Sequence, residues 1–254
     1  MRIVVTNDDG IFAEGIYHLA KALQAIGEVI VIAPSTEQSA KGHSITLHSP
    51  IMVKKIKFFD TDFEAYAVDG TPADCVKLAI EAILKDRRPD IVVSGINNGP
   101  NLGTDVIYSG TVSAAVEAAI LGVPSIAVSM ATTKIDNYDG AANFACKIAK
   151  SILHIIDDQS TVFNINYPTC RPESIKGVKV TTLGLRKYCN SFDERKDPQG
   201  NSYYWVSGTA LELEQNQDSD IVSIKNNYIS ISPIHFDLTA FNTFQRLKDW
   251  SIEL

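Results

Sequence analysis

Cysteine is scarce and scattered in this sequence. The chain has cysteines at positions 75, 146, 170 and 189, and no two of them form a CxxC pair. A zinc site built on such pairs is therefore not expected. Three nucleotide and hydrolase signatures are also missing, since no GxGxxG, GxxxxGK[ST] or GxSxG stretch occurs. Their absence disfavours a dinucleotide-binding fold, a P-loop NTPase and a serine-hydrolase elbow.

Long apolar runs and basic clusters are missing as well. No uninterrupted apolar run approaches the roughly 18 residues that a membrane-spanning helix needs. The first residues, MRIVVTNDDG, lack the apolar region and cleavage site of a secretory signal. The formal net charge is −7, and an acidic chain is not expected to carry a long nucleic-acid footprint. We therefore expect a reduced, cytoplasmic protein that binds neither nucleic acid nor a membrane.

The first half of the chain alternates strand-like and helix-like patterns. Of the 254 residues, 45% are hydrophobic, which is enough for a sizeable core. Apolar runs predict buried strands over 2–6, 28–33, 90–93 and 125–130. Helical spacing of apolar residues predicts helices over 14–26, from Thr71 onward and over 111–121. Continuous apolar strands that alternate with helices indicate an α/β fold, a mostly parallel sheet covered by helices on both faces.

The pattern changes after Lys176. Four stretches there favour strands: VKVTTL, SYYWVSG, DIVSI and YISISPI. Polar segments separate them, which predicts hairpins or an arm rather than further βαβ units. A short helix with an apolar stripe is expected over about 239–251. The simplest organisation is one α/β domain over 1–254, with a core over about 1–183 and a C-terminal arm and helix over about 184–254.

Polar segments follow three of the predicted strands. Asn7–Gly10 follows the first strand, the segment 34–43 with Ser39 follows the second, and 94–99 with Asn97 follows the third. Open parallel sheets place their ligands at the carboxyl ends of their strands. If these strands are parallel neighbours, the three segments meet at one edge of the sheet.

The adjacent carboxylates of Asp8 and Asp9 are the sharpest feature of that edge. Gly10 follows them, so a turn can direct both toward one point. Two converging carboxylates repel each other unless a proton or a cation lies between them. Oxygen ligands from Asp, Asn and Ser suit hard divalent cations such as Mg²⁺ or Mn²⁺. The alternative is that Asp8 and Asp9 form only a turn and a helix cap.

The segment 95–113 predicts a phosphate-binding loop. It is rich in glycine and proline, so its backbone can approach a ligand closely. A helix then begins near Ser109, Gly110 and Thr111, whose N–H groups and hydroxyls can hold a phosphate group. Ordinary N-capping is the alternative for both hydroxyl residues. His43 can contact phosphate or relay a proton, although a solvated loop histidine is the simpler interpretation.

Five motifs together resemble the SurE (survival protein E) family of 5′(3′)-nucleotidases. They are MRIVVTNDDGI, PSTEQSAKGHSITL, VDGTPADCV, VSGINNGPNLGTDVIYSGTVSAAVEA and YISISPIHFDLT. They span nearly the whole chain in order and spacing. One position differs, because Asn227 precedes Tyr228 where the family usually has glycine. Asparagine tolerates left-handed backbone angles, so we expect the turn to be kept.

The resemblance implies a Rossmann-like α/β core and one divalent metal per subunit. By the family pattern, the metal ligands are Asp8, Asp9, Ser39 and Asn97. We also expect the loop that carries Asn97 to hold phosphate oxygens. The family hydrolyses nucleoside 5′- and 3′-monophosphates, and some members also cut short polyphosphate. Members form homodimers or homotetramers that exchange C-terminal arms.

The expected chemistry is metal-assisted phosphomonoester hydrolysis with Asp8 and Asp9 as catalytic residues. The attacking group stays open between a metal-bound water, deprotonated with the help of an aspartate, and Asp8 itself. A haloacid-dehalogenase-type phosphatase needs Asp-x-Asp-Gly after its first strand, and here Asn7 stands at the nucleophile position. The other rival is a non-catalytic module that uses the same loops to bind nucleotide or phosphate.

Overall fold

A nine-stranded sheet forms the centre of the computed structural model, which describes residues 1–132, 137–153, 155, 160–211, 213–248 and 250. The strand order is β3-β4-β2-β1-β5-β6-β7-β13-β8. The strands are β1 (Arg2–Thr6), β2 (Glu28–Pro34), β3 (Met52–Lys55), β4 (Glu64–Asp69), β5 (Ile91–Asn97), β6 (Ser125–Met130), β7 (Val162–Tyr167), β8 (Val178–Val180) and β13 (Ile229–Ile234).

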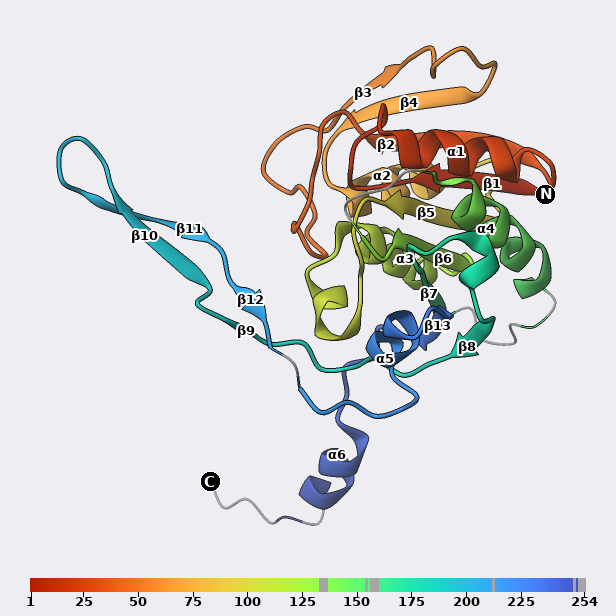
Figure 1. The fold of residues 1–254 in the computed structure, drawn as a ribbon. Helices are drawn as coiled ribbons and strands as arrows, with labels where there is room; N and C mark the ends of the chain where they lie inside the picture. The colour runs from red at the N-terminus through yellow and green to blue at the C-terminus, as the bar shows by residue number, and fades with distance from the viewer. Residues whose placement is uncertain (133–136, 154, 156–159, 212, 249, 251–254) are drawn as a thin grey trace.

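The strands from β4 to β7 in this order pair in parallel, whereas β3 and β13 pair antiparallel to β4 and β7. Helices cover both faces of the sheet (Figure 1). They are α1 (Glu14–Leu23), α2 (Pro72–Leu78), α3 (Gly110–Ile120) and α4 (Asp139–Ile152). The predicted α/β class, a mostly parallel sheet with helices on both faces, is confirmed.

Alternation along β1 explains the two covered faces. Ile3 and Val5 pack with α1 and α4, and Val4 packs with α2 and α3 on the opposite face. All three side chains are fully buried. A strand buried on both sides needs apolar residues at every position, which is why the central strands read as continuous apolar runs.

Local signals place the starts of two helices as predicted. Thr71 caps α2 in a capping box with Asp74, and Pro72 occupies its first turn. A short π-helix, η1 (Ala79–Ile83), continues α2. Ser109 caps α3. A 3₁₀ turn, η2 (Gly103–Ile107), precedes that cap.

The C-terminal part departs from the prediction in two places. Asp220–Ile224 was expected to form a strand, and this is wrong: Asp220–Lys225 is helix α5, because the Ser219 hydroxyl accepts a hydrogen bond from the Val222 N–H and caps it. The stretch YISISPI was expected to belong to a hairpin or an arm, and this is wrong as well: its strand β13 lies inside the central sheet, antiparallel to β7 and parallel to β8. The turn before it is kept, since Asn227 adopts φ +62°.

An arm leaves the body of the molecule after β8 (Figure 1). It consists of two antiparallel pairs, β9 with β12 and β10 with β11. Their bounds are β9 (Tyr188–Cys189), β10 (Phe192–Lys196), β11 (Ser202–Val206) and β12 (Thr209–Ala210). Helix α6 (Phe241–Lys248) also lies away from the sheet, and a 3₁₀ turn, η3 (Pro172–Ser174), precedes β8.

Large apolar side chains of the arm and α6 are exposed. On the arm they include Phe192, Tyr204 and Trp205, and on the terminal segment Phe241 and Trp250. Residues 249 and 251–254, part of the predicted terminal helix and extension, lie outside the described residues. In the part of the chain that is described, no helix is both long and apolar enough to cross a membrane.

Candidate functional site

Three loops meet at the carboxyl edge of the sheet, as expected from the strand pattern. β1 lies between β2 and β5, and both pair with it in parallel. The loops are also bonded to one another. The Gln38 N–H donates to the carbonyl oxygen of Asp8 over 2.7 Å, and the Asn98 N–H donates to Oδ2 of Asp9 over 2.9 Å. The segments that carry the aspartates, Ser39 and Asn97 are therefore neighbours.

Asp8 is held by the N-terminus of α3. Its side chain is buried, with 4% of the residue exposed. The Thr111 hydroxyl donates to Oδ1 of Asp8, and backbone N–H groups of Gly110 and Thr111 also bond to this carboxylate. Burial raises the pKa of Asp8, and these hydrogen bonds oppose the shift without cancelling it.

Asp9 carries a perturbed pKa for related reasons. Burial, opposed by the Asn98 N–H and reinforced by the negative charges of Asp8 and Glu37, raises the pKa of Asp9 to about 6. Both aspartates thus sit where the protein alone disfavours their charged forms. A nearby positive charge would reverse this effect.

Gly110 makes the close approach between α3 and Asp8 possible. A Cβ at this position would lie 2.7 Å from Cβ of Asp8 and 3.1 Å from Cγ of Pro72. The starts of α2 and α3 therefore converge on the aspartate pair, and any side chain at position 110 would separate them.

Ser39 and Asn97 flank the aspartates. Ser39 is exposed, and its hydroxyl donates to Oε1 of Glu37 over 2.7 Å. The Asn97 amide nitrogen donates to the carbonyl oxygen of Gly99 over 2.8 Å. This contact uses the nitrogen of the amide, and the oxygen is the atom that suits a hard cation.

The expected phosphate-binding residues have partners within the chain. Ser109 accepts a hydrogen bond from the Val112 N–H over 3.1 Å, so the N-cap interpretation is confirmed for its hydroxyl. The Thr111 hydroxyl donates its hydrogen bond to the Asp8 carboxylate, a contact that the sequence did not predict. Nε2 of His43 lies 2.8 Å from Oε2 of Glu117, so His43 is not simply a solvated loop residue.

The residues at this edge fit a hard divalent cation. The donors brought together are carboxylate, hydroxyl and amide oxygens, and ion pairs between described residues include none to Asp8 or Asp9. Within the described ranges no cluster of three or more His, Cys, Asp and Glu residues is arranged to hold a metal. Carboxylate, hydroxyl and amide oxygens are the donor types that hard divalent cations prefer.

Sequence reasoning did not single out Asp74 and Glu117, two buried carboxylates beside this site. Asp74 accepts hydrogen bonds from Thr46 as well as from Thr71. Each had a visible signal. Thr71-x-x-Asp74 has the spacing of a capping box, and Glu117 is the one acidic residue in the helix sequence GTVSAAVEAAI.

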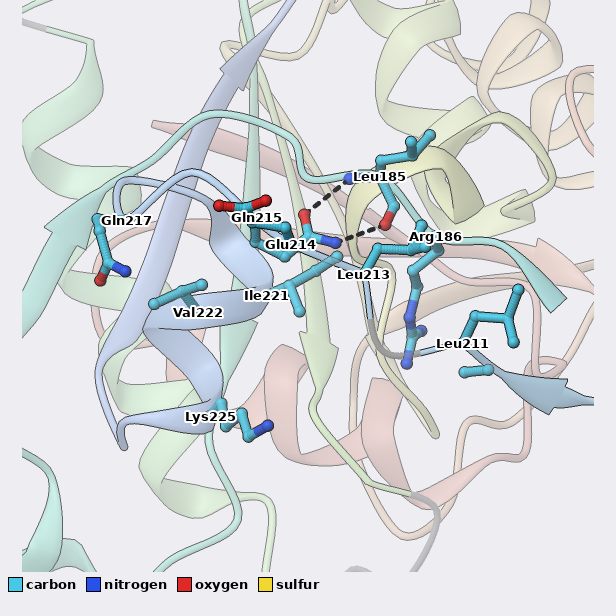
Figure 2. A pocket seen from close by; sticks show the side chains of 11 residues that line it. Leu185, Arg186, Leu211, Leu213, Glu214, Gln215, Gln217, Ile221, Val222 and Lys225 are labelled. Atoms are coloured by element: carbon cyan, nitrogen blue, oxygen red, sulfur yellow. Dashed lines mark hydrogen bonds between the residues drawn. The ribbon is translucent and has the colours of Figure 1, made fainter.

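Two of the cavities bordered by described residues bear on the function, and neither is lined by Asp8 or Asp9. One, of about 450 Å³, opens between the base of the arm and α5, and Figure 2 shows Gln215 bonded to Leu185 across its lining. It contains none of the predicted site residues. The other, of about 500 Å³, is bordered by His43, η2, the first turns of α3 and the segment 234–238. This second cavity adjoins the Thr111 helix start.

Comparison with known proteins agrees with these features. A profile of the family described as "Survival protein SurE" matches residues 3–190. A curated protein named 5′-nucleotidase SurE from Alkaliphilus metalliredigens is 66% identical over 253 residues, covering 100% of both chains. A protein of the same name from Carboxydothermus hydrogenoformans is 51% identical and covers 98% of this chain and 96% of its own.

A solved structure also matches this chain in fold. The crystal structure of the SurE protein from Aquifex aeolicus superposes with a TM-score of 0.84 at 40% sequence identity, covering 98% of both chains.

Proposed function

Because this chain belongs to the survival protein SurE family, we propose that it is a metal-dependent 5′-nucleotidase that hydrolyses nucleoside monophosphates to nucleoside and phosphate. One observation carries the proposal. Asp8 is buried and Asp9 is half-buried at the carboxyl edge of the sheet, and both have raised pKa values. The segments that carry Ser39 and Asn97 are hydrogen-bonded to them through Gln38 and Asn98. Full-length relatives named 5′-nucleotidase SurE support the same reaction.

The proposed cation ligands are Asp8, Asp9, Ser39 and Asn97. Mg²⁺ or Mn²⁺, one per subunit, suits these oxygens. When bound, the cation supplies positive charge that stabilises the charge developing on the transferred phosphate. The protein keeps Asp8 in one orientation through the Thr111 hydroxyl and the α3 N–H groups. Such fixed groups need no rearrangement as the reaction proceeds.

The phosphate is proposed to lie beside Asn97 and the Ser109–Gly110–Thr111 turn. The partial positive charge of the α3 N-terminus favours an anion there, although Asp8 already uses part of it. His43, held by Glu117, is a further phosphate contact in this proposal. Water, with an aspartate as proton acceptor, and Asp8 itself remain the two candidate nucleophiles.

The nucleoside is proposed to occupy the cavity beside His43. Apolar side chains such as Val112, Val116 and Ile234 line it, and Thr104 and Ser113 add hydroxyl groups. Apolar walls with a few polar groups are typical of small-molecule sites. Val116→Phe should raise KM for nucleoside monophosphates about tenfold by filling this space. KM for glycerol 2-phosphate, which has no base, should stay unchanged; an equal rise for both substrates would contradict the placement.

Oligomerisation into a dimer or tetramer is also proposed. Its support is the exposed aromatic surface of the arm and of α6, which one chain does not bury. We also propose a division into a core over about 1–183 and a C-terminal extension over about 184–254, whose arm makes the contacts between subunits. Within this extension, β13 belongs to the central sheet and α5 packs against it.

Phosphate release from a panel of nucleoside 5′- and 3′-monophosphates and short polyphosphate tests the proposed reaction. Release that EDTA abolishes and Mg²⁺, Mn²⁺ or Co²⁺ restores would support it, and the panel would define the preferred phosphate position and base. A folded protein that binds nucleotide but releases no phosphate with any of these metals would instead support the non-catalytic binding module.

A further inference from the structure

Two buried carboxylates near the site are neither proposed metal ligands nor proposed phosphate contacts. Asp74 is 3% exposed and Glu117 is 6% exposed. Both contact the segment 35–48, which follows β2 and carries Ser39 and His43; we name it the Ser39 loop. Buried carboxylates are costly unless they are hydrogen-bonded, so their partners show what they hold in place.

Asp74 bonds to more than its own helix cap. The capping box of α2 is complete with Thr71, whose N–H donates to Oδ2 of Asp74 over 2.9 Å. Asp74 also accepts the Thr46 N–H at Oδ1 over 3.0 Å and the Thr46 hydroxyl at Oδ2 over 2.6 Å. In addition, the Thr71 hydroxyl donates to the carbonyl oxygen of Ser44 over 2.7 Å. The start of α2 therefore anchors the C-terminal part of the Ser39 loop.

Further contacts hold the loop on either side of Ser39. The Gly42 N–H donates to the carbonyl oxygen of Tyr108 over 3.0 Å, and His43 contacts Glu117 over 2.8 Å. On the other side, the Gln38 N–H donates to the carbonyl oxygen of Asp8. Ser39 lies in the short exposed span between these contacts.

One backbone conformation within that span also requires support from neighbouring residues. Ala40 has φ +57°, a left-handed conformation that a residue with a Cβ rarely adopts unless its surroundings impose it. Without the contacts at Gly42 and Thr46, the span would relax toward other conformations and Ser39 would lose its place beside the aspartates.

The anchor and the aspartate pair belong to the same packed unit. Pro72, in the first turn of α2, lies so close to Gly110 that a Cβ there would be 3.1 Å from its ring, and the same Cβ would be 2.7 Å from Cβ of Asp8. Asp74 lies in the same first turn as Pro72. A loop tied to Asp74 is therefore placed relative to Asp8.

We propose that Asp74 is a positioning residue for the metal site: through Thr46 it holds the Ser39 loop so that Ser39 stays beside Asp8 and Asp9. The inference rests on the proposed function, and it assigns a role to the TPAD motif, residues 71–74, which the catalytic assignments leave unexplained. Asp74 acts through the loop and touches neither phosphate nor metal.

Thr46→Val tests the role of Asp74 without disturbing the α2 cap. It removes the hydroxyl that donates to Asp74 and leaves the bonds between Asp74 and Thr71. We expect the dissociation constant for Mn²⁺, measured by calorimetry without substrate, to rise about tenfold, the usual scale for a lost hydrogen bond to a charged group. Saturating Mn²⁺ should restore most of kcat, and Thr46→Ser, which keeps the hydroxyl, should bind Mn²⁺ like the unaltered protein.

Thr181→Val is the matched control. The side chain of Thr181 is buried, whereas that of Thr46 is half-buried, and the Thr181 hydroxyl lies 2.7 Å and 2.8 Å from the hydroxyls of Ser230 and Ser232, next to the edge strand β8. It should lower thermal stability to a similar extent and leave Mn²⁺ affinity unchanged. Hydrogen exchange should show faster exchange of the Ser39 loop in Thr46→Val and not in Thr181→Val.

The outcomes separate this inference from the proposed function. Unaltered Mn²⁺ affinity in a folded Thr46→Val protein, or an equal loss in Thr181→Val, would overturn the role given to Asp74. A wild-type protein that binds Mn²⁺ but releases no phosphate would contradict the nucleotidase proposal alone. A wild-type protein that binds no divalent cation would contradict both.

Discussion

The carboxyl edge of the sheet and the arm are built in opposite ways. At the edge, polar groups are buried, and side chains from distant segments bond to one another, as Thr111 does to Asp8. On the arm, strands β10 and β11 pair only with each other within the described chain, and Trp205 is 60% exposed. Polar groups at the edge thus find hydrogen-bond partners within one chain. The arm, by contrast, has apolar surface that a single chain leaves exposed.

This difference separates two kinds of constraint. Asp8 and Asp74 at the edge are each held by several partners, so a substitution of either should disturb the geometry of the site. Residues on the arm are held by local pairing, so a substitution there should change association and leave turnover per site largely intact. One junction links the regions, because Asp105 near the α3 start accepts hydrogen bonds from Arg186 and Tyr188 at the base of the arm.

The largest effect is expected at Asp8. Asp8→Asn should lower kcat roughly a thousandfold or more, the scale seen when one member of a catalytic group is removed. It should also weaken metal binding, because a charged ligand is replaced by a neutral one, while the fold is kept. Phosphate release and calorimetric metal titration measure both effects. Asp60→Asn, an exposed site in an ion pair with Lys57, is the control, and wild-type turnover by Asp8→Asn would refute the site assignment.

Glycine substitutions contrast the two regions directly. Gly110→Ala places a Cβ 2.7 Å from Cβ of Asp8, and such overpacking should cost about 1–3 kcal/mol of unfolding free energy and most of the activity. Gly200 lies at the tip of the arm with φ +89°, and a Cβ added there would have no atom within 4 Å. Gly200→Ala should cost about 1 kcal/mol through backbone strain alone. Its activity should match the unaltered protein in the same assay; equal losses in the two variants would erase the contrast.

Association should respond to the arm. The double substitution Tyr204→Ser and Trp205→Ser removes exposed aromatic surface, so the oligomer should dissociate at higher concentrations than the unaltered protein. Thermal stability of the dissociated chain should change little, within about 0.5 kcal/mol, because these positions are exposed. Light scattering over a concentration series measures the first effect. An unchanged mass at every concentration would place the subunit interface elsewhere.

The smallest expected effect is a pH dependence. Burial raises the pKa of Asp74, but hydrogen bonds from Thr46 and Thr71 outweigh it, so the net pKa is lowered from 3.8. A carboxyl with a lowered folded-state pKa adds stability above its unfolded pKa and loses it as pH falls through the folded value. Below pH 4, Asp74→Asn should therefore lose less stability than the unaltered protein.

Asp197 on the arm is the comparison for that measurement. Its pKa is also lowered, first by the Asn201 side chain, but the partners of Asp197 all lie within its own local turn. Asp197→Asn should follow the wild-type curve of unfolding free energy against pH. If Asp197→Asn flattens that curve as much as Asp74→Asn does, the Asp74 carboxylate contributes no more to the pH dependence of stability than a surface carboxylate does.

Elements governed by local spacing were predictable. Continuous apolar runs identified β1, β2, β5 and β6, and Thr71 with Pro72 marked the start of α2. Asn227 adopted the left-handed turn that its residue type allows. The stretch Asp220–Ile224 was misassigned, because its β-branched residues suggest a strand while the Ser219 cap and burial against the sheet decide for a helix.

The sequence by itself determined the α/β class, because strand and helix periodicity are local properties, and the order and spacing of five motifs identified the family. It also placed Asp8, Asp9, Ser39 and Asn97 in segments that follow three strands, but the pairing of those strands brings the segments to one edge. Only the tertiary structure decided which groups each site residue meets. The partners Asp8 and Thr111 are 103 positions apart, His43 and Glu117 are 74 apart, and Thr46 and Asp74 are 28 apart. No local pattern encodes such pairs, since they depend on how helices pack across strands that neighbour in space and not in sequence.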